Sequence, residues 1–164
     1  MTAPDPTPPG DGPAGGCLCG RLRYRLAAVP TDVAHCHCRL CQRSSGAAML
    51  TWATVPRAGL AVAGEPAWYR SSATARRGFC PTCGAQLFFA HDVDARDSRP
   101  DLPADAETPI DVTVASLDAP DAAVPDSNIW VGSRRAFLHG FDATLPDHLD
   151  EGPAPTPAPP VERP

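Results

Sequence analysis

The sequence predicts an all-β fold: a small domain of short strands, stabilised by a bound metal ion. Short apolar runs recur along the chain, each bounded by Gly, Pro, Asp or Ser, and such runs are typical of strands. Helical periodicity is almost absent. Seven cysteines fall into three compact clusters, which favours metal binding. A chain of 164 residues is long enough for one domain with a buried core.

The clearest strand signal is residues 21–26 (RLRYRL), where polar and apolar residues alternate strictly, as they do in a half-buried strand. The other predicted strands are residues 47–54, 67–70, 85–90, 110–115 and 128–131. Residues 39–45 predict one or two helical turns, whereas prolines interrupt residues 119–124. Four aromatic residues of the predicted strands are expected in the core, where one of them could wall a pocket: Trp52, Trp68, Phe88 and Phe89.

Three segments contain little that could bury apolar surface. Residues 1–15 and 151–164 are rich in Pro and Gly, so ordering them would cost entropy without compensation, and we expect disordered tails. Residues 92–109 are acidic and interrupted by prolines, which predicts a long surface loop. The predicted domain therefore spans residues 16–150.

Charge and composition narrow the class of partner. The formal net charge is −5, and the fourteen basic residues are all Arg, spread along the chain. Nucleic acid is therefore disfavoured as a partner. No basic start precedes an apolar run, and no stretch approaches the ~18 consecutive apolar residues of a membrane helix. We expect a soluble, cytoplasmic protein without a membrane partner.

Cysteine spacing carries the strongest functional signal. An odd number of cysteines without a secretory signal argues against a disulfide framework, which leaves metal binding or thiol chemistry. In Cys80-Pro-Thr-Cys83-Gly, the two intervening residues let both sulfurs face one ion. Gly84 permits the positive φ that such a turn often needs. The spacing of this cluster predicts half of a zinc site.

A tetrahedral structural site needs two more thiolates, and Cys17 and Cys19 can supply them if the backbone bends there. The bend is expected from the flanking glycines Gly15, Gly16 and Gly20. The remaining cluster is Cys36, Cys38 and Cys41. Its three sulfurs can bind a second zinc and leave one coordination position open, as in a catalytic site.

Two alternatives stay open from spacing alone. His35 or His37 could complete the middle cluster to a closed site, so that all seven sulfurs serve folding. At strand spacing, however, both histidines point away from Cys36, which favours hydrogen bonding around the site over ligation. In the other alternative, Cys38 and Cys41 form a redox pair by disulfide exchange.

Four sequence blocks together resemble one known family: GGCLCGRLRY, HCHCRLCQRSSGA, RGFCPTCGAQL, and VTVASLDAP followed by NIWVGSRRAFL. They resemble the glutathione-dependent formaldehyde-activating (GFA) family, which is related to centromere protein V. The resemblance covers residues 16–146. It implies an all-β zinc domain of several short sheets, similar to methionine sulfoxide reductase B and the Rab-binding zinc β domains.

The resemblance also implies two zinc sites with different roles. Matching positions make Cys17, Cys19, Cys80 and Cys83 the ligands of a structural zinc. They make Cys36, Cys38 and Cys41 the ligands of a labile catalytic zinc. The implied activity is a carbon–sulfur lyase of the S-(hydroxymethyl)glutathione synthase type, which condenses formaldehyde with glutathione or a similar thiol. The alternative is a non-catalytic carrier module that binds glutathione or zinc.

Several polar residues near the cysteines are candidates for binding the thiol. Arg39, Gln42 and Arg43 flank the middle cluster, and the planar guanidinium suits the carboxylates of a glutathione-like tripeptide. The alternative is that they are solvated surface side chains. Arg76 and Arg77, next to the third cluster, could act in the same way or offset the charge of a four-thiolate zinc.

Overall fold

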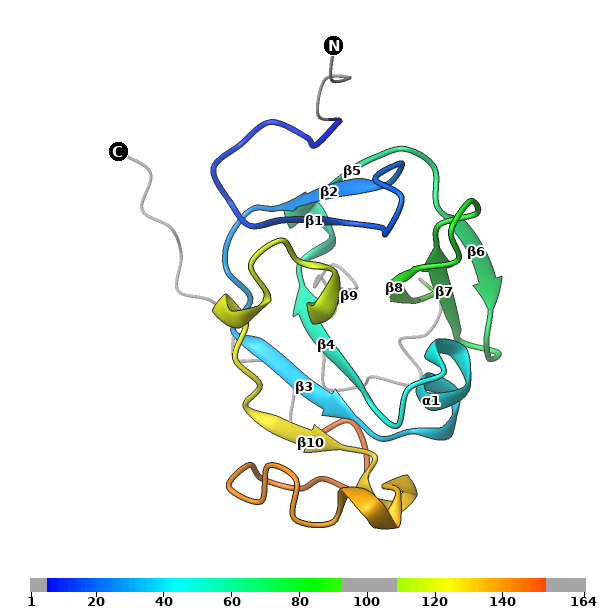
Figure 1. Ribbon diagram of the computed structural model, residues 1–164, viewed down its shortest axis with the longest axis vertical. Helices are drawn as coiled ribbons and strands as arrows, with labels where there is room; N and C mark the ends of the chain where they lie inside the picture. Colours follow the sequence, from blue (N-terminus) through cyan, green and yellow to red (C-terminus); the bar gives the residue numbers. More distant parts are fainter. Residues whose placement is uncertain (1–5, 93–108, 153–164) are drawn as a thin grey trace.

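The computed structural model describes residues 6–92 and 109–152, and two β-sheets form its framework (Figure 1). The smaller sheet has three antiparallel strands in the order β1-β2-β5: β1 (Ala14–Gly16), β2 (Arg23–Leu26) and β5 (Leu60–Ala63). The larger sheet has seven strands in the order β10-β3-β4-β9-β8-β7-β6. Its strands are β3 (Asp32–Cys36), β4 (Leu50–Val55), β6 (Ala67–Arg70), β7 (Ala75–Phe79), β8 (Gln86–His91), β9 (Ile110–Thr113) and β10 (Ser127–Ile129). Neighbouring strands of this sheet are antiparallel except for the parallel pair β10 and β3.

One α-helix lies in the described part of the chain, α1 (Arg39–Ser45), and it matches the predicted helical turns. Cys38 caps the N-terminus of this helix, because its Sγ accepts a hydrogen bond from the Cys41 N–H at 3.2 Å and so satisfies one of the free donors of the first turn. The helix is capped at its C-terminus by Gly46, which takes a left-handed φ of 74°. Five short 3-10 turns complete the described elements: Arg57–Gly59, Val114–Ser116, Pro120–Ala122, Val131–Ser133 and Ala136–Leu138. None of the helices described is long and apolar enough to cross a membrane.

The prediction of a mainly β domain is confirmed, and every predicted strand overlaps an observed one. Four strands were not predicted. Strand β3 (DVAHC) and strand β7 (ARRGF) carry polar side chains among apolar ones, which hides the apolar run that marks a strand. Strands β1 and β5 are short and rich in Ala and Gly. The specific likeness to methionine sulfoxide reductase B and the Rab-binding domains stays a prediction.

Strand β1 starts two residues before residue 16, inside the segment predicted as a tail. The residues before it lie against β2, where Arg25 Nε donates to the Pro8 carbonyl at 2.6 Å and Arg25 Nη1 donates to the Gly12 carbonyl at 2.6 Å. The Arg25 guanidinium thus supplies hydrogen-bond donors for the backbone carbonyls of this Pro/Gly-rich segment. Most of the predicted acidic loop (93–108) and C-terminal tail (153–164) lie outside the described residues.

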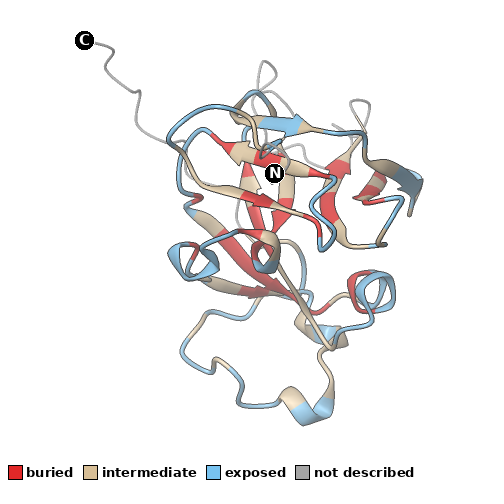
Figure 2. Ribbon diagram, turned by 45° about the horizontal axis from the view of Figure 1, so that its top comes forward, coloured by how far each residue is buried: buried red, intermediate tan, exposed pale blue. Residues whose placement is uncertain are grey.

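The main core lies between the two sheets. Tyr24 and Leu26 of β2 pack in one apolar cluster with Phe88 of β8 and Val112 of β9, and all four are buried. Figure 2 shows that buried residues concentrate on the strands, whereas the C-terminal turns are largely exposed. Phe88 is therefore a core residue, as predicted, whereas the prediction for Trp68 is wrong, because its side chain is exposed. Phe89, the neighbour of Phe88, points to the other face of the larger sheet, because side chains alternate along a strand.

That other face carries a second, smaller apolar cluster. Cys36, Cys41 and Trp52 are buried in it, and Phe89 and Ile129 pack against them. The larger sheet thus has a structural face toward the smaller sheet and an opposite face that bears the middle cysteines.

Candidate functional site

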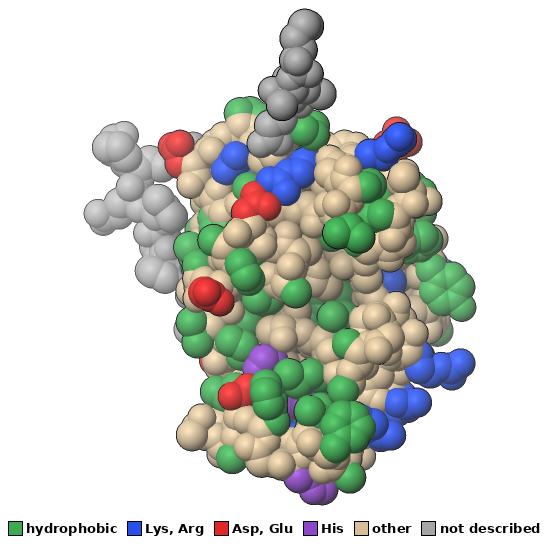
Figure 3. All heavy atoms as spheres, viewed as in Figure 1, with side chains coloured by type: hydrophobic (Ala, Val, Ile, Leu, Met, Phe, Trp, Pro, Cys, Tyr) green, Lys and Arg blue, Asp and Glu red, His purple; other side chains and the backbone are tan. Residues whose placement is uncertain are grey.

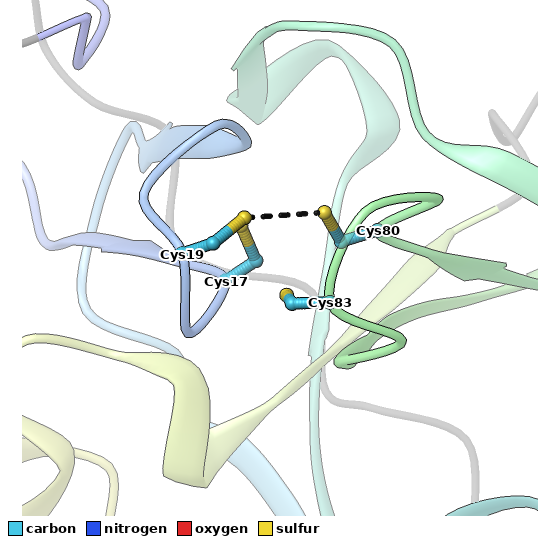
Figure 4. Close-up of side chains that lie close together, drawn as sticks. All are labelled: Cys17, Cys19, Cys80 and Cys83. Carbon is cyan, nitrogen blue, oxygen red and sulfur yellow. Dashed lines mark hydrogen bonds between the residues drawn. The ribbon is translucent and has the colours of Figure 1, made fainter.

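The first and third cysteine clusters meet at one point in space (Figure 4). The sulfur atoms of Cys17, Cys19, Cys80 and Cys83 all lie within 4.8 Å of one another. The Cys17 and Cys19 sulfurs are 3.5 Å apart, and the Cys19 and Cys80 sulfurs are 3.7 Å apart. A disulfide would need about 2.0 Å, whereas Zn–S bonds of roughly 2.3 Å in a tetrahedron place sulfurs roughly 3.8 Å apart. The four sulfurs therefore fit one tetrahedral metal ion.

Two turns position these four sulfurs. Cys17 and Cys19 follow β1, and Cys80 and Cys83 lie between β7 and β8. In the second turn the Gly84 N–H donates to the Cys80 carbonyl at 2.9 Å, and Gly84 has a φ of 74°. The positive φ expected at Gly84 is confirmed. The Leu22 N–H donates to Cys17 Sγ at 3.2 Å, a contact that favours the thiolate.

The glycines around Cys17 have two different roles. Gly20 has a φ of 75° and makes the expected bend. Gly15 and Gly16 instead lie in strand β1, so the bend predicted there is wrong. A Cβ on Gly15 would lie 2.4 Å from the Tyr24 ring, which is closer than real Cβ atoms approach other atoms. These positions need glycine because the chain packs closely against β2.

The middle cysteines form a second, separate cluster. Cys36 ends β3, Cys38 caps α1, and Cys41 lies in the first turn of α1. Their sulfurs lie within 4.8 Å of one another, and those of Cys36 and Cys41 are 3.5 Å apart. No histidine or carboxylate of the described residues joins this set, so the cluster offers three ligands to an ion.

The three thiols lie so close together that they change one another's pKa values. The Cys36 thiol donates to Cys41 Sγ. Interaction with the sulfurs of Cys38 and Cys41 raises the pKa of Cys36 far above its ordinary value, whereas interaction with Cys36 lowers the pKa of Cys38. Only part of the set can therefore ionise without a cation, because thiolates this close repel one another. A bound divalent ion would remove that conflict. The donor set thus fits a soft metal ion such as zinc.

Two side chains donate hydrogen bonds to the middle cluster. Trp52 Nε1–H and Arg77 Nη2–H each donate to Cys41 Sγ at 3.5 Å. Arg77 is buried and its guanidinium lies 5.1 Å from the centre of the Phe89 ring. The sequence predicted a role for Arg77 beside the third cysteine cluster. The alternation of β7 instead turns it toward the middle cluster, where its positive charge lowers the pKa of Cys38.

The two histidines of the middle cluster bond elsewhere. His35 Nδ1 lies 2.9 Å from Thr51 Oγ1, and His35 Nε2 lies 2.9 Å from an Asp142 carboxylate oxygen. His37 is fully buried, and its Nε2 lies 3.1 Å from Asn128 Oδ1. The His35 ring ties β3 to Thr51 and Asp142, and the His37 ring ties the segment after β3 to Asn128 of β10. The alternative of a closed site with a histidine ligand is therefore disfavoured.

The three predicted thiol-binding residues differ in position. Arg39 is exposed and lines a cavity beside the cysteines, and its Nη1 donates to Gln42 Oε1. Gln42 is buried, and its Nε2 donates to the His37 carbonyl at 2.6 Å and to the Ser133 carbonyl at 3.1 Å. Arg43 is exposed on α1, outside the cavity wall. Figure 3, in the same view as Figure 1, shows basic side chains over the position of α1.

The cavity covers the second face of the larger sheet and has a volume of about 880 Å³. All three middle cysteines line it, together with Trp52 and Phe89. Two of the four aromatic residues named from the sequence therefore form part of a pocket wall. Charged and titratable residues complete the wall: Asp32, Arg39, Arg77, His91, Asp111, Asp150 and Glu151. A small molecule in this cavity would have access to a three-sulfur metal site.

Replacing Trp52 by phenylalanine tests the hydrogen bond to Cys41. Phenylalanine can keep the contact with Phe89, whose ring centre lies 5.9 Å away, but it has no N–H. We expect about tenfold weaker metal binding at the middle cluster, the lower end of the effect of removing a group that supports a ligand. Competition with a chromophoric chelator measures it. Trp68→Phe is the matched control, since Trp68 stacks on Phe88 instead; equal affinity in both variants would contradict the expectation.

Comparison with models of known protein families identifies one family for this chain. The profile of the family described as "Glutathione-dependent formaldehyde-activating enzyme" matches residues 13–133. An uncharacterized lyase of Schizosaccharomyces pombe is 26% identical over 77 residues, which are 47% of this chain and 56% of that protein. The match thus spans little more than half the length of this curated relative. A crystal structure of a Rhodobacter sphaeroides protein is 22% identical with a TM-score of 0.48, covering 82% of this chain and 98% of that one.

Proposed function

Because this chain belongs to the glutathione-dependent formaldehyde-activating enzyme family, we propose that it is a zinc-dependent carbon–sulfur lyase. It joins a small aldehyde such as formaldehyde to glutathione or a similar thiol, and it cleaves the adduct in the reverse direction. The observation that carries the proposal is the set of three cysteine sulfurs in the wall of an 880 Å³ cavity. Similarity to a protein named as a lyase supports the same reaction class.

The two cysteine clusters have different roles in this proposal. Cys17, Cys19, Cys80 and Cys83 hold a structural zinc whose coordination is complete. Cys36, Cys38 and Cys41 hold the catalytic, labile zinc. A zinc ion with three protein ligands would leave its fourth position for the sulfur of the incoming thiol and lower the pKa of that sulfur.

In this proposal three side chains around the middle cluster position the reacting groups: Trp52, Arg77 and Phe89. Trp52 and Arg77 hold Cys41 by their N–H donors, which fixes the cluster at the cavity wall. Trp52 and Phe89 present apolar surface to the cavity, and this excludes water from the attack of the sulfur on the aldehyde carbon. Arg77 adds a positive charge near the developing negative oxygen.

Of the predicted thiol-binding residues, Arg39 is the best placed. It is exposed at the cavity wall, where its guanidinium can pair with a carboxylate of glutathione. Gln42 supports it by accepting a hydrogen bond from Arg39 while its own amide is anchored to backbone carbonyls. Arg43 stays a candidate for a more distant carboxylate. We propose the cytoplasm as the compartment, because all seven cysteines are free and reducing conditions maintain free thiols.

Calorimetry with glutathione and S-methylglutathione tests the pocket. The proposal needs a free sulfur at the middle cluster, so S-methylglutathione should bind at least about tenfold more weakly, a difference of about 1.4 kcal/mol. Consumption of formaldehyde and glutathione, measured above the uncatalysed rate, tests turnover. Equal affinity for the two ligands would contradict the proposed pocket, and tight glutathione binding without turnover would favour the carrier alternative.

A further inference from the structure

Asp111 is a carboxyl group of the cavity wall that lies near the middle cluster without touching it. It belongs to β9, where it is half-buried. In the sheet register it lies opposite Thr54 of β4 on one side and Phe89 of β8 on the other. The Thr54 hydroxyl donates to Asp111 Oδ1 at 2.8 Å. This contact orients the carboxyl and leaves Oδ2 for another partner.

The register also places Asp111 close to the residues that support Cys41. Trp52 lies two residues before Thr54 on the same face of β4, so it is the diagonal neighbour of Asp111, roughly 7–8 Å away. Phe89 lies opposite Arg77 in the next strand. Trp52 and Arg77 are the two donors to Cys41 Sγ. Asp111 and the three middle cysteines line the same cavity, so a small molecule in that cavity can contact both.

The surroundings give this carboxyl an unusual acidity. Burial raises the pKa of Asp111 to about 7, the Thr54 hydrogen bond opposes that rise, and the charges of Asp32 and Glu151 add to it. Charged or titratable groups from several surrounding elements face the same cavity: Asp32 and Cys36 of β3, Cys38, Arg39 and Cys41 at α1, Arg77 of β7, His91 of β8, and Asp150 and Glu151 after β10. Near neutral pH the carboxyl is therefore present in both its protonated and ionised forms, as a general acid–base group requires.

We propose that Asp111 carries the proton of the reaction, taking it from the thiol and returning it to the aldehyde oxygen. This inference rests on the proposed function, and it supplies the proton acceptor that the cysteine clusters lack. The reaction needs no further proton donor, because the thiol supplies the proton that ends on the product hydroxyl.

The two steps balance in atoms and electrons. First the S–H bond of the bound thiol breaks, and its proton moves to the Asp111 carboxylate. Next the sulfur electron pair forms the new S–C bond, and the carbonyl π electrons move to the oxygen. That oxygen takes the proton from Asp111, which yields the S-hydroxyalkyl product and restores the carboxylate. The reverse sequence cleaves the adduct, with Asp111 accepting the hydroxyl proton.

Replacing Asp111 by asparagine tests the inference. Asparagine keeps the size and can accept from Thr54, but it does not titrate. In the wild type, kcat/KM for condensation should rise with pH through about 7, because the carboxylate is the form that accepts the thiol proton. In Asp111→Asn, kcat/KM should fall about 100-fold or more, and that rise should disappear. Unchanged activity with the same pH profile would overturn the inference.

A second variant separates proton transfer from a merely structural role. Thr54→Val preserves shape but removes the hydrogen bond that favours the carboxylate. The pH profile should therefore shift to higher pH while the variant keeps most of its activity at its new optimum. Asp121→Asn, at an exposed carboxyl of a remote 3-10 turn, is the control and should match the wild type. A Thr54→Val profile identical to the wild type would contradict the role of Asp111.

Proton release on glutathione binding gives a readout that does not depend on turnover. Calorimetry at pH 7.5 in two buffers of different ionisation enthalpy should show release of only about a quarter of a proton in the wild type, since Asp111, with a pKa of about 7, is mostly ionised at that pH and takes up the rest. Asp111→Asn should release about one proton per thiol bound. Equal release in both proteins would overturn the inference while leaving the lyase proposal intact. A wild type without turnover above the uncatalysed rate would instead overturn the proposed function.

Discussion

Replacing Cys80 by serine is expected to unfold the domain or to lower its free energy of unfolding by about 5 kcal/mol or more. Cys80 is fully buried and belongs to the main core cluster, and its sulfur lies 3.7 Å from that of Cys19. Serine would remove one of four ligands from a site that joins the turn after β1 to the turn between β7 and β8. Binding of a structural metal ion contributes directly to folding, and its loss is comparable with the whole stability of a domain.

Urea denaturation followed by circular dichroism measures this loss. Thr82→Ser is the matched control, since Thr82 lies in the same turn but is exposed and is not a ligand. The control should unfold at the wild-type urea concentration. A Cys80→Ser protein that also unfolds there would show that the four-cysteine cluster does not stabilise the domain.

Replacing Cys38 by serine is expected to abolish turnover, with a loss of about 10³-fold or more, while the fold persists. Cys38 is half-buried and lies outside the main core. Its second role is to cap α1 by accepting from the Cys41 N–H, and a serine hydroxyl serves that role well. The free energy of unfolding should therefore stay within about 1 kcal/mol of the wild type.

Turnover assays beside thermal melts of the same sample test both halves of this expectation. Ser44→Ala, at an exposed position of the same helix, is the control and should keep turnover and stability. Full aldehyde–thiol turnover by Cys38→Ser, above the uncatalysed rate, would rule out the middle cluster as the reaction site.

Part of the site could be predicted from local sequence, because it depends on the spacing of neighbouring residues. The two-residue spacing of Cys80 and Cys83, followed by Gly84, fixes a turn with both sulfurs on one side, so this half-site was visible in the sequence. The helix at 39–45 and the alternation in β2 were also visible because they depend on neighbouring residues. Spacing alone gave the pairing of the first and third clusters, and the structure brings their sulfurs together.

The remaining site depends on strand pairing between distant segments. Arg77 looks like a neighbour of Cys80 in the sequence, yet the alternation of β7 turns it to the opposite face, toward Cys41. Asp111 belongs to a short strand of ordinary composition. It faces the cavity because β9 lies between β4 and β8, a position that no local pattern encodes. Phe88 and Phe89 show the same limit, because only the register reveals which one faces the core.

Native mass spectrometry of the metal content tests the central claim most directly, that four cysteines form one zinc site and three form another. The wild type should carry two zinc ions, and Cys38→Ser should carry one while remaining folded. A wild type with a single zinc ion that Cys38→Ser retains would contradict the second site, and with it the chemistry proposed for the cavity.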